Sequence, residues 1–455
     1  MIKIYNSLTN KLEEFKPIQE GKLTIYVCGP TVYNKPHIGN SRPVVFFDTV
    51  VRFFKYLGYE VTYVSNFTDI DDKIINKAIE ENTTEKVISE RYIEANLRAY
   101  RKLNCLPCDY NPKVTENIDG IIEFISELIE KGGAYEVDGD VYFDTTKIDE
   151  YGVLSGQTIE NLISGARIET NDKKRHSVDF ALWKKTDVGI KWPSPWGEGR
   201  PGWHTECVVM INKILGNQID IHGGGSDLKF PHHDNEIAQS ICNYDNKIAN
   251  YWIHNGRIDL SGEKMSKSLG NVIWAEDLVE QMGYQAYRMM FFNTPYRQQI
   301  NYKEEMAQQA KNDIDKMKRT YVSLFRKVEM ADVEDFGRAE ITYQDLVDIK
   351  TRFIEAMSND FNTPNAVTEL FNITKLTNTL VRQNTSADIL NQCLALFSDM
   401  LWVLGINFEI EKLSPDDLVL VKEWQEARNN KDFQKADELR KEIMERNISL
   451  WFKMI

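Results

Sequence analysis

The stretch Leu23-Thr24-Ile25-Tyr26-Val27, which runs into Cys28-Gly29-Pro30-Thr31, decides the fold of this chain. Its apolar, partly β-branched residues are typical of a buried strand, and Gly29 and Pro30 are turn residues that end the strand at Cys28. Apolar positions then recur with helical spacing over about 41–58, and a β-rich run follows over 59–64. Strand, glycine-containing turn, helix and strand form a βαβ unit, which predicts an α/β fold with a Rossmann-type parallel sheet.

Ligands of such a sheet bind beyond the carboxyl ends of its strands. Cys28 and His37 follow the first predicted strand, and Thr68 and Asp69 follow the second. We therefore expect these four residues at one edge of the sheet.

The rest of the chain separates by composition into further segments. The pattern is helical over about 74–102 and 115–131, changes to short β-rich pieces such as 140–143 within an insertion, and returns to the sheet through 219–222. Beyond about residue 301 glycines nearly vanish, and four amphipathic helices predict a bundle: 307–329, 342–357, 365–380 and 389–404. Thr363 and Pro364 suit a helix cap and first turn.

These changes of character give the expected domain boundaries. We predict a Rossmann domain in two halves, a connective insertion, a region around the lysine-rich loop, a helical bundle, and a small C-terminal module. The Rossmann domain covers 1–113 and 201–250, and the insertion covers 114–200. The region around the lysine-rich loop covers 251–305, the bundle 306–408 and the C-terminal module 409–455.

Composition indicates a globular protein of the cytoplasm. The 455 residues are 42% hydrophobic and 27% charged, and no apolar run approaches the roughly 18 residues of a membrane span. The N-terminus lacks an apolar signal core, and the six cysteines are too scattered for a disulfide framework. A net charge of -14 argues only weakly against nucleic acid, because local basic patches occur on acidic proteins.

A lysine-rich stretch, Gly262-Glu263-Lys264-Met265-Ser266-Lys267-Ser268-Leu269-Gly270, predicts a phosphate-binding loop. Glycines at both ends let the loop move, and ammonium groups three residues apart, with serine hydroxyls between them, suit a polyphosphate. For an arbitrary pair of lysines an exposed charged turn is the better interpretation. What favours the phosphate site here is a resemblance, shared with the distant segment Pro36-His37-Ile38-Gly39-Asn40, to a known pair of motifs.

A second candidate site is a metal centre. Five of the seven histidines fall between His204 and His254, and His232 and Glu236 are four residues apart, on one face of a helix. Cys28 and Cys207 are natural candidates for two further ligands, and a set of two thiolates, one imidazole and one carboxylate favours zinc. From spacing alone, buried cysteines with a solvated histidine remain an alternative.

Several motifs carry a resemblance to a known family. His37-Ile38-Gly39-Asn40 and Lys264-Met265-Ser266-Lys267-Ser268 resemble the HIGH and KMSKS signatures of class I aminoacyl-tRNA synthetases. Five longer stretches, spread over nearly the whole chain, look like the cysteinyl-tRNA synthetase family: 26–33, 68–73, 200–207, 220–227 and 230–239. Asn40 stands where the signature has a second histidine, so that side chain can donate a hydrogen bond but carries no charge.

The resemblance implies a cysteine–tRNA ligase. Such an enzyme activates L-cysteine with ATP to cysteinyl-adenylate, releases pyrophosphate and transfers cysteine to tRNA(Cys). It implies one zinc ion per chain that selects the substrate thiolate and Mg²⁺ with ATP, and we expect a monomer that binds no membrane. Two alternatives stay open: a zinc-dependent cysteine ligase acting on an amino-sugar acceptor, and a non-catalytic RNA-binding paralogue.

The resemblance also assigns the site residues. It implies zinc ligands Cys28, Cys207, His232 and Glu236. It implies catalytic residues His37, Lys264 and Lys267, with Gly39, Asn40 and Ser266 completing the ATP-binding set. It implies an amino-acid pocket lined by Thr68, Trp203, His204 and His222, with Asp227 for the substrate ammonium.

Two groups of residues have weaker assignments. Candidate phosphate contacts to tRNA, for each of which a solvated helix face is an equal or better interpretation, are Lys316, Lys318, Arg319, Arg326, Arg428, Lys431, Lys435 and Arg440. Cys105 and Cys108 form a C-x-x-C pair, but without a second pair nearby packing is the better interpretation. The apolar finish over 448–455 differs from the polar tail common in the family.

Overall fold

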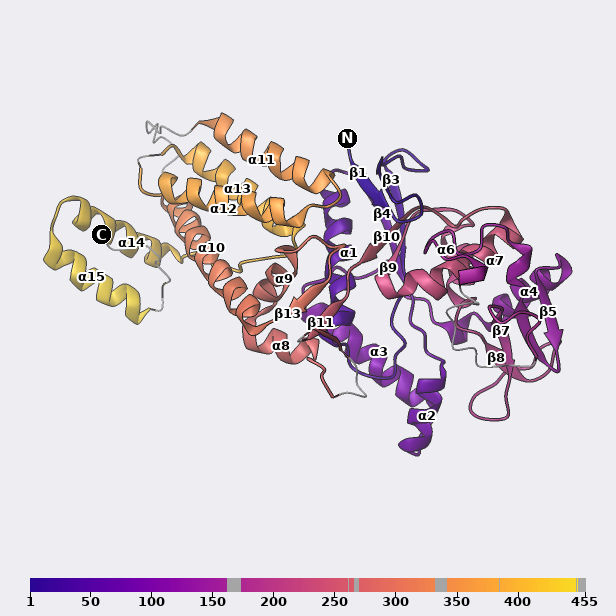
Figure 1. Ribbon diagram of the computed structural model, residues 1–455. Helices are drawn as coiled ribbons and strands as arrows, with labels where there is room; N and C mark the ends of the chain where they lie inside the picture. The colour runs from indigo at the N-terminus through magenta and orange to yellow at the C-terminus, as the bar shows by residue number, and fades with distance from the viewer. Residues whose placement is uncertain are drawn as a thin grey trace. The chain divides into compact units, whose positions relative to one another are not determined.

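The computed structural model describes residues 1–161, 173–260, 262–265, 270–331, 342–383, 385–446 and 448 (Figure 1). The chain divides into two compact units. The first comprises Met1–Gln281 and Tyr296–Lys303, and the second comprises Met282–Pro295 and Glu304–Ile455. Cys28, Cys207, His232, Glu236 and the segment His37–Asn40 all lie in the first unit.

The first unit is organised around a parallel sheet, as the sequence predicted. Its strands have the order β10-β9-β3-β4, and every neighbouring pair is parallel. Their bounds are β3 (Lys22–Val27), β4 (Glu60–Ser65), β9 (Ile219–Gly225) and β10 (Ala249–Asn255). The prediction of a Rossmann-type α/β fold is confirmed.

The two faces of this sheet have different roles. Helix α1 (Ile38–Tyr56) packs on one face, where a Cβ atom added at Gly223 would lie 2.1 Å from the Phe47 ring. Only glycine allows that close approach of helix and strand. Since strand side chains alternate, Tyr26, His222 and Trp252, which are in register, point to the opposite face. That opposite face carries the histidine cluster described below.

The insertion forms its own antiparallel sheet, β5-β6-β7-β8. The strands are β5 (Ala134–Val137), β6 (Asp140–Phe143), β7 (Phe180–Lys185) and β8 (Gly199–Pro201), and helix α4 (Ile118–Glu130) precedes them. Buried Asp179 accepts hydrogen bonds from Tyr135 Oη at 2.6 Å and from both the backbone N–H and hydroxyl of Thr145 at 3.0 Å. This carboxylate ties the first turn after β6 to the approach to β7.

One helix prediction is wrong in its extent. The segment expected to be helical over 74–102 is two helices, α2 (Asp72–Glu80) and α3 (Glu85–Lys102). The break occurs at Asn82, which has φ +50°, and Thr84 accepts from the Val87 N–H to cap α3. Asparagine tolerates this left-handed conformation, and threonine is a preferred cap, so local polar chemistry breaks the helix although the apolar pattern continues.

A small second sheet and one helix surround the lysine-rich stretch. The sheet comprises β11 (Ile258–Leu260), β12 (Glu263–Lys264) and β13 (Ile300–Tyr302), and α8 (Ala275–Met282) follows. The N-terminal hairpin of β1 (Lys3–Asn6) and β2 (Lys11–Glu14) pairs separately. Within the first unit, Arg42 of α1 donates to the carbonyls of Gly256 at 2.6 Å and Gln298 at 2.7 Å. It thereby holds the segments that flank the small sheet against α1.

The second unit is helical within its described residues. The four predicted bundle helices are confirmed to within a few residues as α10 (Glu304–Met330), α11 (Tyr343–Ser358), α12 (Thr363–Leu380) and α13 (Ala387–Val403). The cap of α12 differs from the prediction, because Asn362 is the N-cap and Thr363 and Pro364 form the first turn. Asn362 outcompetes threonine since its side-chain oxygen reaches the Asn365 N–H at 3.1 Å.

Three further helices complete this unit. Helix α9 (Tyr284–Phe292) packs on α10, and its buried Arg288 donates to the Leu404 carbonyl at 2.8 Å. The last two, α14 (Pro415–Asn429) and α15 (Phe433–Glu445), form a hairpin with its own small apolar core. Among the helices that the structure describes, none has the length and apolar character needed to cross a bilayer.

Candidate functional site

The turn after β3 brings the ends of two strands together. The Cys28 N–H donates to the Gly223 carbonyl at 3.2 Å, and the Gly29 N–H donates to Asn66 Oδ1 at 2.9 Å. A Cβ atom at Gly29 would lie 1.6 Å from the Asn66 carbonyl oxygen, so only glycine fits. Beyond it, Thr31 and Thr68 form a β-bridge. Cys28 and Thr68 therefore lie at one edge of the sheet, as predicted.

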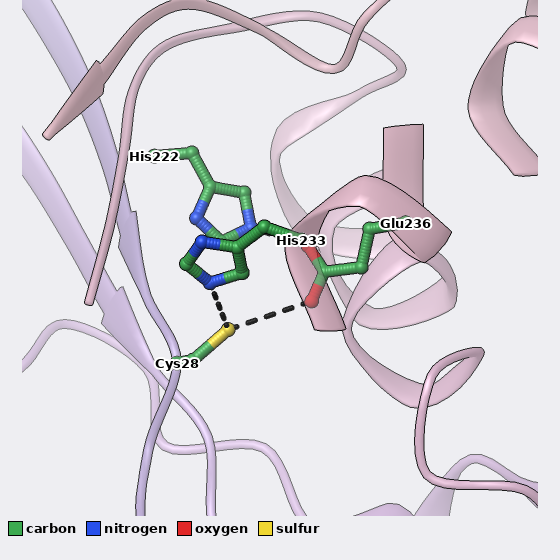
Figure 2. A group of neighbouring side chains, drawn as sticks. All are labelled: Cys28, His222, His233 and Glu236. Carbon is green, nitrogen blue, oxygen red and sulfur yellow. Dashed lines mark hydrogen bonds and ion pairs between the residues drawn. The ribbon is translucent and has the colours of Figure 1, made fainter. Parts of the chain in front are cut away.

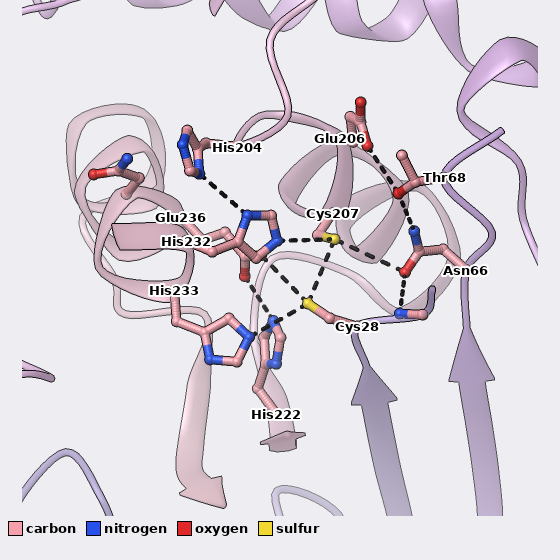
Figure 3. A network of polar contacts seen from close by, with 12 residues as sticks. Cys28, Asn66, Thr68, His204, Glu206, Cys207, His222, His232, His233 and Glu236 are labelled. Atoms are coloured by element: carbon pink, nitrogen blue, oxygen red, sulfur yellow. Dashed lines mark hydrogen bonds and ion pairs between the residues drawn. The ribbon is translucent and has the colours of Figure 1, made fainter. Parts of the chain in front are cut away.

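Cys28, Cys207, His232 and Glu236 converge on one point at this edge (Figure 3). Their candidate ligand atoms all lie within 4.8 Å of one another. The two sulfur atoms are 3.6 Å apart, and Cys207 Sγ lies 3.8 Å from His232 Nε2. Glu236 Oε1 lies 2.9 Å from His232 Nε2 and 3.5 Å from Cys28 Sγ. The structure thus brings together all four side chains expected to be ligands.

Each of the four comes from a different element. Cys207 lies in the first turn of α6 (Glu206–Leu215), and Glu236 lies in the first turn of α7 (Asp234–Tyr244). His232 belongs to a short π-helical turn, Lys229–His233, that directly precedes α7. The expectation that His232 and Glu236 share one regular helix is therefore wrong, although the two side chains still meet. Cys28 directly follows strand β3, so the group joins four parts of the fold.

A second, overlapping group shares Cys28 and Glu236 (Figure 2). It adds His222 of β9 and His233, which lie close enough to be ligands as well. His222 Nε2 lies 2.7 Å from Glu236 Oε2, and His233 Nε2 lies 3.4 Å from Cys28 Sγ. The other ring nitrogen of His233 lies 2.8 Å from His254 Nε2. His222, His233 and His254 thus lie next to the group of Cys28, Cys207, His232 and Glu236.

Burial and mutual charge set the protonation of the group. Burial alone would raise the pKa of Glu236, but His222 and His232 hold it well below its usual value. Burial opposes charging His232, and Glu236 nevertheless raises the pKa of that imidazole to about 10. The bond from Cys28 lowers the pKa of Cys207 to about 6, whereas burial raises that of Cys28 well above its usual range. Without a metal, the group is a buried ion pair beside one thiolate.

The donor set fits a small tetrahedral cation. Metal–sulfur bonds of about 2.3 Å and metal–nitrogen or –oxygen bonds of about 2.0–2.1 Å give tetrahedral ligand separations of about 3.3–3.8 Å. The four separations given above span 2.9–3.8 Å, and all ligand atoms lie within 4.8 Å of one another. Burying ionisable groups is costly unless they are paired or bind a cation. Two cysteines, one histidine and one carboxylate gathered together are therefore best explained as ligands of a cation. His222 forms a hydrogen bond with Oε2 of Glu236, the carboxylate oxygen that is not next to His232. Metal ligands usually have such a supporting hydrogen bond.

Four of the predicted pocket residues, Thr68, Trp203, His204 and His222, lie around this group. Trp203 stacks on the His232 ring at 4.2 Å between centroids and is 40% exposed, and His204 Nδ1 lies 3.1 Å from His232 Nδ1. Thr68 donates to Glu206 Oε2 at 3.1 Å. Asp227 is exposed in the short 3₁₀ helix Ser226–Leu228 that follows β9. Aromatic and polar side chains thus lie next to the candidate ligands.

The first signature segment forms the start of α1. His37 caps this helix by accepting from the Gly39 N–H at 3.1 Å, and Asn40 Oδ1 accepts from the His37 N–H at 3.3 Å. Asn40 therefore stabilises the cap with the side chain that replaces the second histidine. A Cβ atom at Gly39 would lie 2.9 Å from the His37 ring and 3.2 Å from Met265 Cε. A side chain at position 39 would therefore crowd His37 and Met265.

The lysine-rich stretch is described only in part. Met265 is buried and lies beside Gly39, so the start of this stretch meets the first signature segment, as expected. Lys264 lies on β12, paired with Asp259 of β11. The predictions for Ser266 and Lys267 concern residues outside the described part of the chain.

The structure adds four residues that sequence reasoning did not assign. Asn66 and Glu206 join Gly29, Thr68 and Cys207 into one chain of contacts (Figure 3), and His233 and His254 extend the imidazole cluster. Burial raises the pKa of Glu206 well above its usual value, and Glu206 accepts a hydrogen bond from Thr68. The density of histidines in the sequence signalled the imidazoles. Nothing in the local sequence signalled Asn66.

Known proteins with related sequences share this architecture. Residues 14–312 match the family described as tRNA synthetases class I (C) catalytic domain, and residues 352–409 match the DALR domain. Among solved structures, Mycobacterium tuberculosis methionyl-tRNA synthetase in complex with methionyl-adenylate has a TM-score of 0.63 at 14% identity, covering 84% of this chain and 91% of that chain. LeuRS of Agrobacterium radiobacter K84, in a ternary complex, has a TM-score of 0.57 at 13% identity, covering 87% and 86%. The fold and the matched catalytic domain define a class I aminoacyl-tRNA synthetase.

Closer relatives narrow the class. A cysteine–tRNA ligase of Shouchella clausii is 47% identical over 99% of this chain and 97% of the relative, and one of a Geobacillus species is 46% identical with the same coverage. The chain belongs to the cysteine–tRNA ligase family. This bears out the resemblance found in the signature motifs.

Proposed function

We propose that this chain activates L-cysteine with ATP and transfers it to tRNA(Cys). The observation that carries the proposal is the convergence of half-buried Cys28 with buried Cys207, His232 and Glu236 at the carboxyl edge of the sheet. The family to which the chain belongs supports the same activity. A sulfur-rich metal centre has a direct use in an enzyme that must choose a thiol from other small side chains.

The resident metal in this proposal is one zinc ion per chain. Zinc suits the two thiolates, imidazole and carboxylate, and when bound it would stabilise the substrate sulfur as a thiolate. The chain's own residues give up protons for this: His232 must lose its proton, and Cys28 must ionise. An apolar pocket separates near-isosteres by only about 1–3 kcal/mol, so a donor set that selects sulfur directly exceeds what shape alone provides.

The remaining pocket residues bind and orient the amino acid. Trp203 and His204 line one wall, where stacking on His232 holds Trp203 in place, and Thr68 offers a hydroxyl fixed by Glu206. His222 orients Glu236 from behind. Exposed Asp227 is the proposed partner of the substrate ammonium.

Activation in this proposal proceeds by positioning and charge stabilisation. The cysteine carboxylate attacks the α-phosphorus of ATP, which carries Mg²⁺, and pyrophosphate leaves. His37 lies at the N-terminus of α1, where backbone N–H groups already favour anions, and Gly39 gives the nucleotide room. Lys264 and Lys267 neutralise charge that develops on the pyrophosphate, with Ser266 and Asn40 as further donors. Neither step needs a protein nucleophile.

The helical part of the chain carries tRNA recognition in this proposal. The boundaries remain those expected from the sequence: catalytic halves 1–113 and 201–250, insertion 114–200, loop and stem-contact region 251–305, bundle 306–408 and anticodon module 409–455. The match of residues 352–409 to the DALR domain supports a separate role for this part. We propose that the enzyme acts as a monomer in the cytoplasm.

The two alternatives considered from the sequence have less support. A ligase that delivers cysteine to an amino sugar would share the catalytic core. The two relatives, however, are cysteine–tRNA ligases, and the match covers 97% of each of them. A non-catalytic paralogue would not need the buried ligand group, which is complete.

Three measurements on the purified protein test the proposal. Cysteine-dependent exchange of pyrophosphate into ATP tests activation, and charging of tRNA against a small amine acceptor tests the second substrate. Cobalt substitution tests the metal centre: the visible spectrum should shift with free cysteine and stay unchanged with serine. Absence of exchange in metal-loaded protein would contradict the proposed activity.

A further inference from the structure

Three charged side chains join α3 to the start of α8. Arg98 Nε and Lys102 Nζ, both in the second half of α3, each lie 2.8 Å from Glu276 Oε1. Arg98 Nη2 reaches the other carboxylate oxygen at 3.4 Å, and Lys102 also lies 2.8 Å from Glu280 Oε1. Glu276 is 12% exposed at its side chain, so this ionic cluster is more enclosed than most surface pairs on α3. One carboxylate therefore receives donors from two cations in a partly buried position.

The start of α8 is in turn paired with the first signature segment. The Ile38 N–H donates to the Ile273 carbonyl at 3.0 Å, and the Ala275 N–H donates to the Pro36 carbonyl at 3.0 Å. Between these two bonds, His37 and Trp274 form an antiparallel bridge. Glu276 directly follows Ala275, so the ionic cluster fixes the chain one residue beyond the last of these bonds.

We infer that Glu276, held by Arg98 and Lys102, is a positioning residue for His37. The inference rests on the proposed function, in which His37 donates to the phosphates of ATP. The cluster fixes the start of α8 and, with it, the preceding segment Ile273–Ala275, which pairs with the backbone on both sides of His37. Catalytic groups need placement to well within 1 Å, so a modest loosening of this pairing reduces nucleotide activation.

A merely structural surface pair would behave differently. Exposed ion pairs contribute little, because solvent screens them and ordering long side chains costs entropy. The same helix contains such a pair as a control: Arg101 and Glu94 lie 2.5 Å apart, with 62% and 58% of their side chains exposed. Arg101 and Lys102 are adjacent in sequence, yet only Lys102 reaches the start of α8.

The test compares Glu276→Gln, Glu276→Asp and the charge swap Glu276→Arg with Arg98→Glu, using Glu94→Gln as the matched control. Pyrophosphate exchange is measured without tRNA, varying ATP and cysteine separately. We expect Glu276→Gln to lower kcat/KM for ATP about three- to tenfold while KM for cysteine changes less than about twofold. The charge swap should recover part of the loss, and Glu94→Gln should behave as the parent protein.

Hydrogen exchange gives a readout independent of activity. Peptides that contain Ile38 and Ala275 should lose protection in Glu276→Gln and keep it in Glu94→Gln. Parent-level kcat/KM for ATP and unchanged protection in both Glu276 variants would overturn the inference, and Glu276→Asp serves if Glu276→Gln does not fold. Absence of pyrophosphate exchange in the parent protein would instead refute the proposed function. Hydrogen exchange at Ile38 would still decide whether the ionic cluster holds the backbone pairing with Ile273.

Discussion

His222 Nε2 lies 2.7 Å from Glu236 Oε2, and neither side chain has any exposed surface. Because a carboxylate only accepts, His222 donates through Nε2 and the outer oxygen of Glu236 is committed to it. The inner oxygen, Oε1, is left facing His232 and Cys28. One carboxylate is therefore divided between a supporting imidazole and the candidate metal group.

This division predicts that His222 controls metal affinity. In His222→Leu the carboxylate is free to rotate away from Cys28, and loss of such a supporting bond typically weakens metal binding by about 10–100-fold. His222→Gln retains a donor and should lose less. Competition with a zinc chelator measures the affinity, and His176→Gln, in the insertion, is the control. Unchanged affinity in His222→Leu would show that Glu236 is oriented by other contacts.

Gly29 should be intolerant of any side chain. A Cβ atom there would overlap the Asn66 carbonyl oxygen, so Gly29→Ala must separate the ends of β3 and β4 and displace Cys28. We expect a loss of about 2–4 kcal/mol in unfolding free energy together with weaker metal binding.

The matched control for Gly29 is a helical glycine. At Gly120, in α4, an added Cβ would meet only Val209 Cγ1 at 3.4 Å, which is an ordinary contact. Gly120→Ala should therefore be neutral or stabilise the protein by up to about 1 kcal/mol. Urea unfolding measures both variants. Equal effects at the two positions would contradict the argument from close approach.

Lys267→Ala tests the assignment of charge stabilisation to the second signature. Removing one preorganised donor to the transition state costs roughly 3–4 kcal/mol, so adenylate formation should slow about a hundredfold or more. Cysteine binding should barely change, because the substitution leaves the candidate metal ligands in place. Single-turnover formation of the adenylate and cysteine titration of the cobalt form separate the two effects. A large loss of cysteine affinity with normal adenylation would contradict the assignment.

The sheet and the bundle were predictable because their signals are periodic. The apolar run 23–27, its turn at Gly29 and the helix after it repeat a pattern that few other folds satisfy, and the four bundle helices have amphipathic spacing over several turns. Periodicity fails where a polar residue ends an element locally. The break at Asn82 and the cap at Asn362 depend on single side-chain contacts that do not alter the apolar pattern.

The candidate ligands were predictable as a set, whereas their support was not. Cysteine, histidine and glutamate in unusual density are visible in a sequence, and the family resemblance selects four of them. Asn66 supports the same site through Gly29, but an asparagine after a strand has many uses and carries no distinguishing pattern. Glu206 is adjacent to Cys207, yet its role arises from burial against Thr68, which only the folded chain creates.

The pH dependence of stability should reveal the Glu276 cluster. Hydrogen bonds from Arg98 and Lys102 lower the pKa of Glu276 from its usual value of 4.5 to about 2. A carboxyl whose pKa is lower in the folded state stabilises that state when ionised, so the contribution is complete above about pH 4.5 and is lost as pH falls towards 2. Glu276→Gln should thus cost about 1–2 kcal/mol at pH 7, below the full shift because solvent screens the partly exposed Arg98 and Lys102.

The difference between the parent protein and Glu276→Gln should stay constant from pH 6 to 8. It should shrink between pH 4.5 and 2 as the parent carboxyl takes up its proton, and it should shrink at pH 7 in about 1 M salt, where the Debye length is about 3 Å. Urea unfolding at a series of pH values measures it, with Glu94→Gln as a control for loss of an exposed charge on the same helix. A difference that persists undiminished at pH 3 would contradict this assignment, because a protonated carboxyl no longer has the charge that the amide lacks.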